Sequence, residues 1–153
     1  GDFAPAVFLL AQIEAQQGNI KEAINRTFQA AQLAPNDVGV LFQLGLLYYQ
    51  DKNFENSRLA FERAVCLNQN YSNARYFLGL IYDNADRKND AIEQFKKIQE
   101  LNPDNQEVER ILVNLTSGKP ILEGISPPQP APEKRPEVPV IEGKIEKELE
   151  KNP

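Results

Sequence analysis

The sequence contains no histidine and no methionine, and Cys66 is its only cysteine. Without histidine the chain lacks the most common general base and metal ligand, which excludes catalytic sites of the Ser/His/Asp and Cys/His types. A single cysteine cannot form an internal disulfide. As a lone thiol on a predicted helix, Cys66 is better explained as a small hydrophobic residue than as a nucleophile. We therefore predict no enzymatic activity, no metal site and no cofactor.

Long apolar runs and an excess of basic residues are also missing. No run approaches the roughly 20 residues that cross a bilayer, and the N-terminus lacks a secretory signal. Residues 1–117 carry 11 Lys and Arg against 15 Asp and Glu, and residues 118–153 carry 6 against 7. Nucleic acid and anionic membranes attract basic surfaces, so neither is a predicted partner. The compartment stays unassigned: the segment is either cytoplasmic or tethered to a membrane parent.

What the sequence does contain is a stretch that recurs after 34 residues. Residues 41–49 read LFQLGLLYY, and residues 75–83 read RYFLGLIYD. A fixed period of this size indicates one supersecondary unit stacked on itself. Apolar residues at helical spacing, interrupted by turn residues, predict paired helices within each unit. We expect three units at 4–37, 38–71 and 72–105, followed by a capping helix at 106–116.

The units resemble the tetratricopeptide repeat, a 34-residue helical hairpin recognised by small and large apolar positions. The first unit is the weakest match, because Ala11, Glu14 and Thr27 depart from the usual residues. The resemblance implies an all-α fold, a right-handed superhelical stack of antiparallel helix hairpins. The positions that carry it are Val7, Leu10, Ala11, Glu14, Ala23, Thr27, Ala30 and Pro35; then Leu41, Leu44, Gly45, Tyr48, Ser57, Phe61, Ala64 and Gln69; and finally Arg75, Leu78, Gly79, Tyr82, Ala91, Phe95, Ile98 and Pro103.

Small residues at the Gly45 and Ser57 positions remove side-chain bulk, so the paired helices can approach closely while large residues fill the space beside them. The first unit starts abruptly, with an apolar side formed by Phe3, Val7 and Leu10. Together with the absence of methionine, this predicts that further repeats or another domain preceded it in a longer parent chain.

Composition changes after residue 117. Seven of the eleven prolines lie between 118 and 139, which predicts a disordered, extended, polyproline-like linker. A spacer is favoured over a ligand for a partner's aromatic groove. The charged tail 140–153 has Ile141, Ile145 and Leu149 at spacing of four, so disorder with a transient short helix is expected.

Superhelices of this kind bind partners on a concave surface formed mainly by the first helix of each pair. The resemblance lets us place ten residues there, with an aromatic at the same register in each unit. Two interpretations stay open: these aromatics pack between repeats, or they line an apolar groove for a partner's extended segment or helix. Relatives that clamp acidic chaperone C-termini carry Lys, Arg and Asn here, so that function is not carried over. The predicted groove residues are Phe8, Gln12, Phe42, Leu46, Tyr49, Gln50, Tyr76, Leu80, Asp83 and Asn84.

Two short motifs favour structural interpretations. The acidic turn 83–86 with Asp90 lacks the glycine and alternating oxygen ligands of a calcium loop. Asn114-Leu115-Thr116 is one of three matches to the glycosylation pattern, which is frequent by chance.

The leading functional hypothesis is a non-enzymatic protein-interaction scaffold. An alternative is that the chain is the C-terminal accessory domain of a larger bacterial glycan polymerase or ligase in a membrane. A third is self-association, either through the exposed apolar side of the first unit or through the 141–149 stripe occupying the groove.

Overall fold

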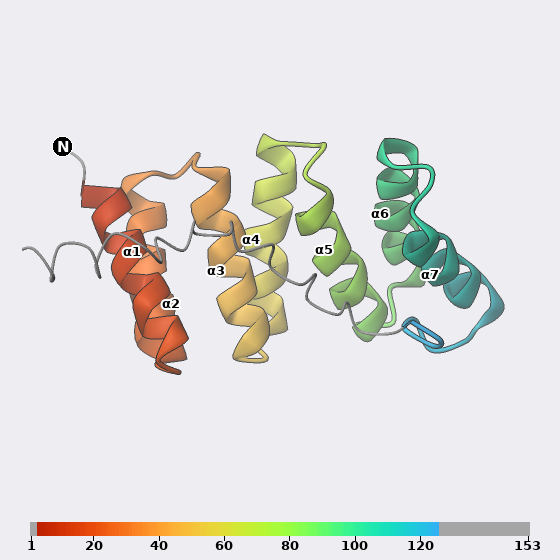
Figure 1. The fold of residues 1–153 in the computed structure, drawn as a ribbon, viewed down its shortest axis with the longest axis horizontal. Helices are drawn as coiled ribbons and strands as arrows, with labels where there is room; N and C mark the ends of the chain where they lie inside the picture. Colours follow the sequence, from red (N-terminus) through yellow and green to blue (C-terminus); the bar gives the residue numbers. More distant parts are fainter. Residues whose placement is uncertain (1–2, 126–153) are drawn as a thin grey trace, which may run out of the picture. The chain divides into compact units, whose positions relative to one another are not determined.

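The computed structural model describes residues 3–125, with side chains from Pro5 onward. The predictions for Phe3 and for residues 126–153, including the tail helix and most of the linker, lie outside the described residues. Between residues 3 and 125 the chain forms seven helices and no strand (Figure 1). They are α1 (Phe3–Gln16), α2 (Ile20–Leu33), α3 (Val38–Gln50), α4 (Phe54–Leu67), α5 (Ser72–Asn84), α6 (Lys88–Leu101) and α7 (Gln106–Ser117).

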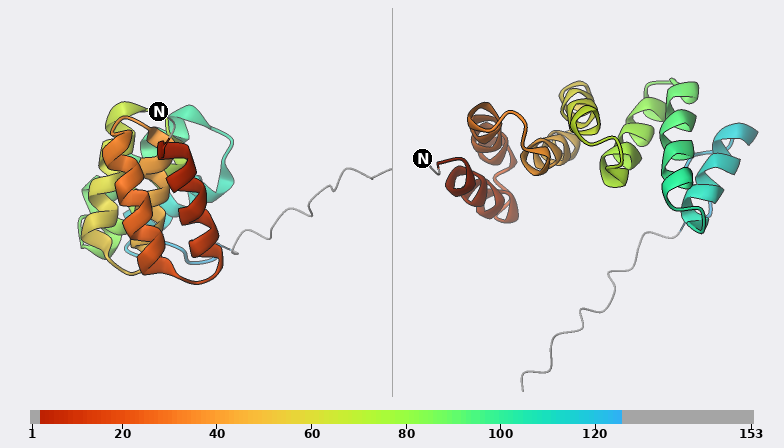
Figure 2. Two further views of the ribbon diagram at one scale, coloured as in Figure 1. Left: turned by 90° about the vertical axis from the view of Figure 1, so that its left-hand side faces the viewer. Right: turned by 90° about the horizontal axis from the view of Figure 1, so that it is seen from above.

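The helices belong to one compact unit, residues 1–123. Consecutive helices pack antiparallel as the hairpins α1–α2, α3–α4 and α5–α6, and each hairpin also contacts the helix that follows it. Helices α1, α3 and α5 form one layer, and α2, α4 and α6 form the second layer (Figures 1 and 2). The predicted all-α stack of helical hairpins is confirmed.

The turn inside each hairpin has the same backbone conformation, spaced by the repeat. Gly18, Lys52 and Asp86 have φ angles of 84°, 59° and 61°. Only the first of these residues is glycine, which adopts a positive φ without strain. The other two units keep the turn although their residues disfavour it, because the packing of the two helices determines where the chain must reverse.

A ring packed against a glycine defines the second and third hairpins. A Cβ atom added to Gly45 would lie 2.6 Å from Cε1 of Phe61, and one added to Gly79 would overlap the ring of Phe95. Both rings are fully buried. The hydroxyl of Ser57 also donates a 2.7 Å hydrogen bond to the Gly45 carbonyl across the hairpin. The helix axes can approach this closely only because no side chain lies between backbone and ring.

The first hairpin solves the same packing problem with different residues. Ala11 stands at the glycine register, and Thr27 stands at the phenylalanine register. Both are fully buried, and the Thr27 hydroxyl donates to the Ala23 carbonyl at 2.8 Å. A methyl group on one helix is thus accompanied by a smaller side chain on the other. The methyl group of Ala11 is therefore tolerated at the glycine register because the first hairpin has no ring at the phenylalanine register.

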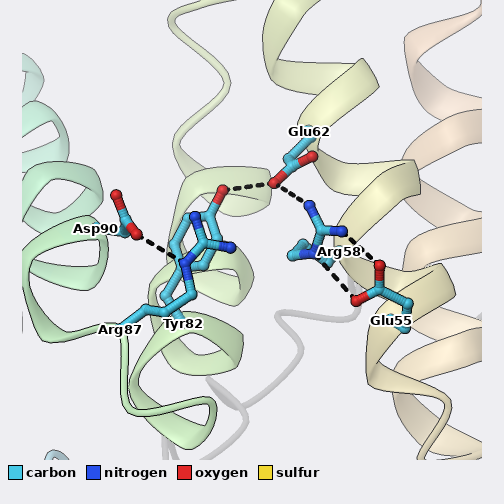
Figure 3. Close-up of polar contacts among 6 residues, drawn as sticks. All are labelled: Glu55, Arg58, Glu62, Tyr82, Arg87 and Asp90. Atoms are coloured by element: carbon cyan, nitrogen blue, oxygen red, sulfur yellow. Dashed lines mark hydrogen bonds and ion pairs between the residues drawn. The ribbon is translucent and has the colours of Figure 1, made fainter.

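A polar network joins the second and third units (Figure 3). The Tyr82 hydroxyl donates to Glu62 at 2.6 Å, and Glu62 also accepts from Arg58 at 2.7 Å. The guanidinium of Arg87 lies 4.5 Å from the centroid of the Tyr82 ring and pairs with Asp90. Tyr82 is almost fully buried, and its one polar atom is satisfied by a charged acceptor. The network links α4 to α5 and to the start of α6.

The contact at Gly45 gives a first prediction. We expect Gly45→Ala to lower the free energy of unfolding by about 1–2 kcal/mol, because overpacking against Phe61 outweighs the better helix propensity of alanine. Urea unfolding followed by circular dichroism measures this change.

Gly39→Ala is the control, because Gly39 lies in the same helix and is exposed, and an added Cβ would meet only Oδ1 of the capping residue Asp37, at 3.3 Å. We expect that variant to change the free energy of unfolding by less than about 1 kcal/mol, because the helix propensity of alanine offsets a small shift of the Asp37 side chain. Equal stability of the two alanine variants would contradict the packing argument.

Candidate functional site

The ten predicted groove residues all lie on α1, α3 and α5, the helices of one layer. Gln50 and Asn84 are exposed, and the other eight are half-buried. None of the ten belongs to the fully buried core. Their solvent-accessible parts therefore lie at the surface. The contacts of six of the ten define two groups, one that packs between repeats and one that lines a hollow.

The first group packs between repeats. The ring of Phe42 lies 5.6 Å from Phe61 and 6.2 Å from Phe77, centroid to centroid. Phe77 stacks on Phe61 at 5.4 Å with an interplanar angle of 11°, and its edge contacts Tyr49 at 5.3 Å. Phe77 thus inserts a ring of the third unit among three rings of the second. Phe77 is not among the predicted groove residues, although its position next to Tyr76 in the recurring stretch is a usable signal.

Tyr76 connects the third unit to the capping helix α7. Its ring meets Phe95 edge-on at 5.6 Å, and its hydroxyl donates to Glu107 at 2.9 Å. Burial and the hydrogen bond to Glu107 both raise the pKa of Tyr76, because both favour the neutral phenol. The aromatics at the shared register in the second and third units therefore hold neighbouring elements together.

The second group surrounds a hollow. Tyr49, Leu80, Asp83 and Asn84, four of the predicted residues, line a cavity of about 200 Å³. The other lining residues are Phe54, Ile81, Ile121 and Leu122. Leu46 and Gln50 on α3, and Phe8 and Gln12 on α1, do not line this cavity. The structure thus brings Tyr49 of α3 together with Leu80, Asp83 and Asn84 of α5.

A short segment after α7 closes one side of this cavity. Gly118 ends α7 with a φ of 72°, and the Glu123 amide donates to the Pro120 carbonyl at 3.0 Å. The amide nitrogen of Asn114 donates to the carbonyls of Ile121 and Glu123, each at 3.0 Å. Residues 120–123, at the start of the predicted linker, therefore form a turn whose main chain is held by buried Asn114.

Asn114 is 4% exposed on the apolar side of an amphipathic helix. Its burial and its two hydrogen bonds leave no room for a glycan, which agrees with a chance match to the glycosylation pattern. A polar residue between Ile111 and Leu115 was the available signal for its role, since buried amides need partners.

A different hollow, of about 390 Å³, lies between α2 and α4. Its walls include Phe28, Leu41, Tyr48 and Leu59. None of its lining residues is among the predicted groove residues. Aligning the repeats nevertheless shows a signal for this hollow. Phe28 occupies the position that Glu62 occupies one repeat later. The charged network described above therefore has an apolar counterpart at the junction of the first and second units.

The residues considered for chemistry, Cys66 and the acidic turn 83–86 with Asp90, do not form one site. Cys66 is exposed, and Asp90 of the acidic turn pairs with Arg87 while Asp83 faces the small cavity. Among residues 3–125, no three His, Cys, Asp or Glu side chains gather closely enough to hold a metal ion. No helix in this described range is both long and apolar enough to cross a membrane.

Two comparisons with known sequences gave different results. A family model described as tetratricopeptide repeat matches residues 2–38 and 41–106. A search of curated proteins gave no significant match.

Solved structures share the fold at low sequence identity. The first TPR of Spaghetti (RPAP3), bound to the HSP90 peptide SRMEEVD, is 21% identical with a TM-score of 0.69, over 75% of this chain and 91% of that one. MamA is 22% identical with a TM-score of 0.71, over 76% and 68%. A Thermobaculum terrenum O-GlcNAc transferase mutant is 22% identical with a TM-score of 0.61, over 73% of this chain and 22% of that one. The TM-scores show that these proteins share the fold of this chain, and at such low sequence identity the similarity is one of fold alone.

The raised pKa of Tyr76 gives a second prediction. The folded state holds this phenol proton more tightly than the unfolded chain, whose tyrosine pKa is near 10. Its contribution to stability is therefore complete below pH 10 and is lost as the pH rises through the folded-state value. We expect Tyr76→Phe to flatten the decline in urea midpoint above pH 10.

Tyr48→Phe is the control, because burial alone raises the pKa of Tyr48. It should flatten the alkaline decline less than Tyr76→Phe does. If the two variants gave the same profile, the hydrogen bond to Glu107 would have no role in the alkaline titration.

Proposed function

Because the chain belongs to the tetratricopeptide repeat family, we propose that it is a non-enzymatic scaffold that binds a segment of another protein across α1, α3 and α5. The supporting observation is the half-buried state of Leu46 and Leu80, which lie on two successive helices of this layer. Apolar side chains in partly accessible positions can lose their remaining water contact when a partner's apolar residues cover them.

The composition of the proposed groove restricts the partner. The ten groove residues include four aromatic residues and two leucines, with Gln and Asn at the edges and no Lys or Arg. Amide side chains can pair with a partner's main chain, and the apolar residues can receive its side chains. An acidic peptide like that in the Spaghetti (RPAP3) complex would find no cation among these residues. We therefore favour an apolar extended segment or amphipathic helix as the ligand.

Leu46 and Leu80 are the residues to change, because Phe42 and Tyr76 pack between structural units. We expect Leu46→Gln/Leu80→Gln to reduce capture of the native partner by about tenfold or more, with little loss of helicity. Affinity capture from a lysate of the source organism, quantified by mass spectrometry, measures the change.

Leu33→Gln/Leu59→Gln is the matched control, because these leucines are exposed on α2 and α4 of the other layer. Capture by this control should equal that of the unaltered chain. A partner lost with the control but kept by the Leu46 and Leu80 variant would contradict binding across α1, α3 and α5.

A second candidate function is self-association through α1. Leu10 and Ile13 are 48% and 50% exposed. Their equivalents one repeat later, Leu44 and Leu47, are 5% and 1% exposed in α3, which packs against α2. The same side of α1 therefore has the residues of a helix junction, and no helix among residues 3–125 covers it. A second copy of this chain could cover it.

We expect Leu10→Gln/Ile13→Gln to abolish any concentration-dependent rise in molar mass measured by sedimentation equilibrium. Leu33→Gln, which changes an exposed leucine on α2, should leave that rise intact. A molar mass that stays at the monomer value for the unaltered chain at all concentrations would contradict self-association.

A further inference from the structure

Residues 119–123, at the end of the compact unit, pack against its helices in the manner of a bound peptide. We call this segment the latch. Asn114 donates to the carbonyls of Ile121 and Glu123, and Ile121 and Leu122 border the cavity that Tyr49 and Leu80 line. The side-chain amide of Asn114 thus binds main-chain carbonyls of the latch. Ile121 and Leu122 border a hollow whose other lining residues are mostly aromatic or aliphatic.

This arrangement separates two kinds of recognition. The Asn114 amide pairs with main-chain atoms, so it holds any sequence whose carbonyls are free. Ile121 and Leu122 supply the part that depends on side chains, because an apolar hollow favours aliphatic groups. The Asn114 amide is buried, so removing the latch would leave its hydrogen-bonding groups needing new partners. A segment of the same chemistry could provide them.

The latch is also incompletely buried. Leu122 is 46% exposed and Ile121 is half-buried, so part of the apolar surface of the segment still faces solvent. Displacement of the latch would therefore expose little additional apolar area. Its covalent connection to α7 nevertheless gives it a high effective concentration at the cavity. A free segment of similar affinity therefore displaces the latch only when it is present in large excess.

We propose that the latch is a resident ligand of the α5 end of the partner-binding face. It occupies this end until a partner displaces it. The displacing segment has the chemistry of the latch itself: two adjacent aliphatic residues with accessible main-chain carbonyls. This inference rests on the proposed scaffold function and names the chemistry of its ligand. The simpler alternative is that the latch only terminates α7 and that the cavity binds nothing in its place.

The experiment supplies the latch in trans. The probe is a fluorescently labelled synthetic peptide of residues 118–125, and the full chain is compared with its Ile121→Ser/Leu122→Ser variant. We expect the variant to bind the peptide at least about tenfold more tightly than the unaltered chain, because its own latch no longer competes. Fluorescence anisotropy measures the affinity, and circular dichroism confirms that both proteins are folded.

Two controls make the result specific. The same peptide with serine in place of both aliphatic residues should lose binding, and Leu33→Ser/Leu59→Ser should bind the peptide no better than the unaltered chain. Equal affinity of the unaltered chain and the latch variant, or equal binding of the two peptides, would overturn the proposal.

A second measurement covers the case in which the latch variant fails to fold. The chain has no tryptophan, so Leu122→Trp introduces a single fluorescent reporter into the latch. We expect excess unlabelled peptide to shift its emission to longer wavelength and to increase its quenching by acrylamide. An unchanged spectrum at saturating peptide would show that the latch is not displaced.

These outcomes are independent of partner capture. If the peptide binds but the Leu46 and Leu80 variant still captures the native partner, the latch site is real and the proposed groove is wrong. If capture depends on those leucines but the peptide never binds, the scaffold function stands and the latch proposal fails.

Discussion

The close approach of two helices at a glycine is the constraint on which the rest of this structure depends. At Gly45 and Gly79 a buried phenylalanine ring lies where a Cβ atom would otherwise stand. This contact sets the distance between the helices of a hairpin and thereby determines where the next helix can pack. The first hairpin reaches the same arrangement with Ala11 and Thr27, both fully buried. The shared requirement is that no side chain at the glycine register clashes with the residue opposite it, and more than one pair of residues satisfies this requirement.

The α1, α3 and α5 layer divides its side chains between two tasks. Phe42 and Tyr76 contact rings or helices of neighbouring elements, so they contribute to the stability of the stack. Leu46 and Leu80 remain as the apolar residues proposed to meet a partner. The distinction matters for experiments, because changing the aromatics would alter helix packing and binding together. Asn114 adds a third element, since it holds main-chain carbonyls at one end of the same layer.

Much of this architecture could be predicted, because a 34-residue period in small and large residues is a local property of the sequence. Helix boundaries, hairpin pairing and the tight contact at Gly45 follow from it. The turn of residues 119–123 could not be predicted, because proline content favours extension and the hydrogen bonds from Asn114 form only after α7 has packed. The positive φ of Lys52 and Asp86 could likewise not be predicted from the sequence, because helix packing overrides the local preference of these residues. The predicted groove residues lie on α1, α3 and α5, and side-chain contacts between repeats, which the sequence does not show, decide which of them are structural.

Ring packing at the two glycines holds the second and third hairpins together, and Phe77 couples these two hairpins into one cooperative stack. Native-state hydrogen exchange, measured amide by amide, tests this coupling. We expect the most protected amides of α3, α4, α5 and α6 to exchange with a single common free energy of opening and with the same denaturant dependence. Separate opening free energies for the α3–α4 and α5–α6 hairpins, with different denaturant dependences, would contradict the claim.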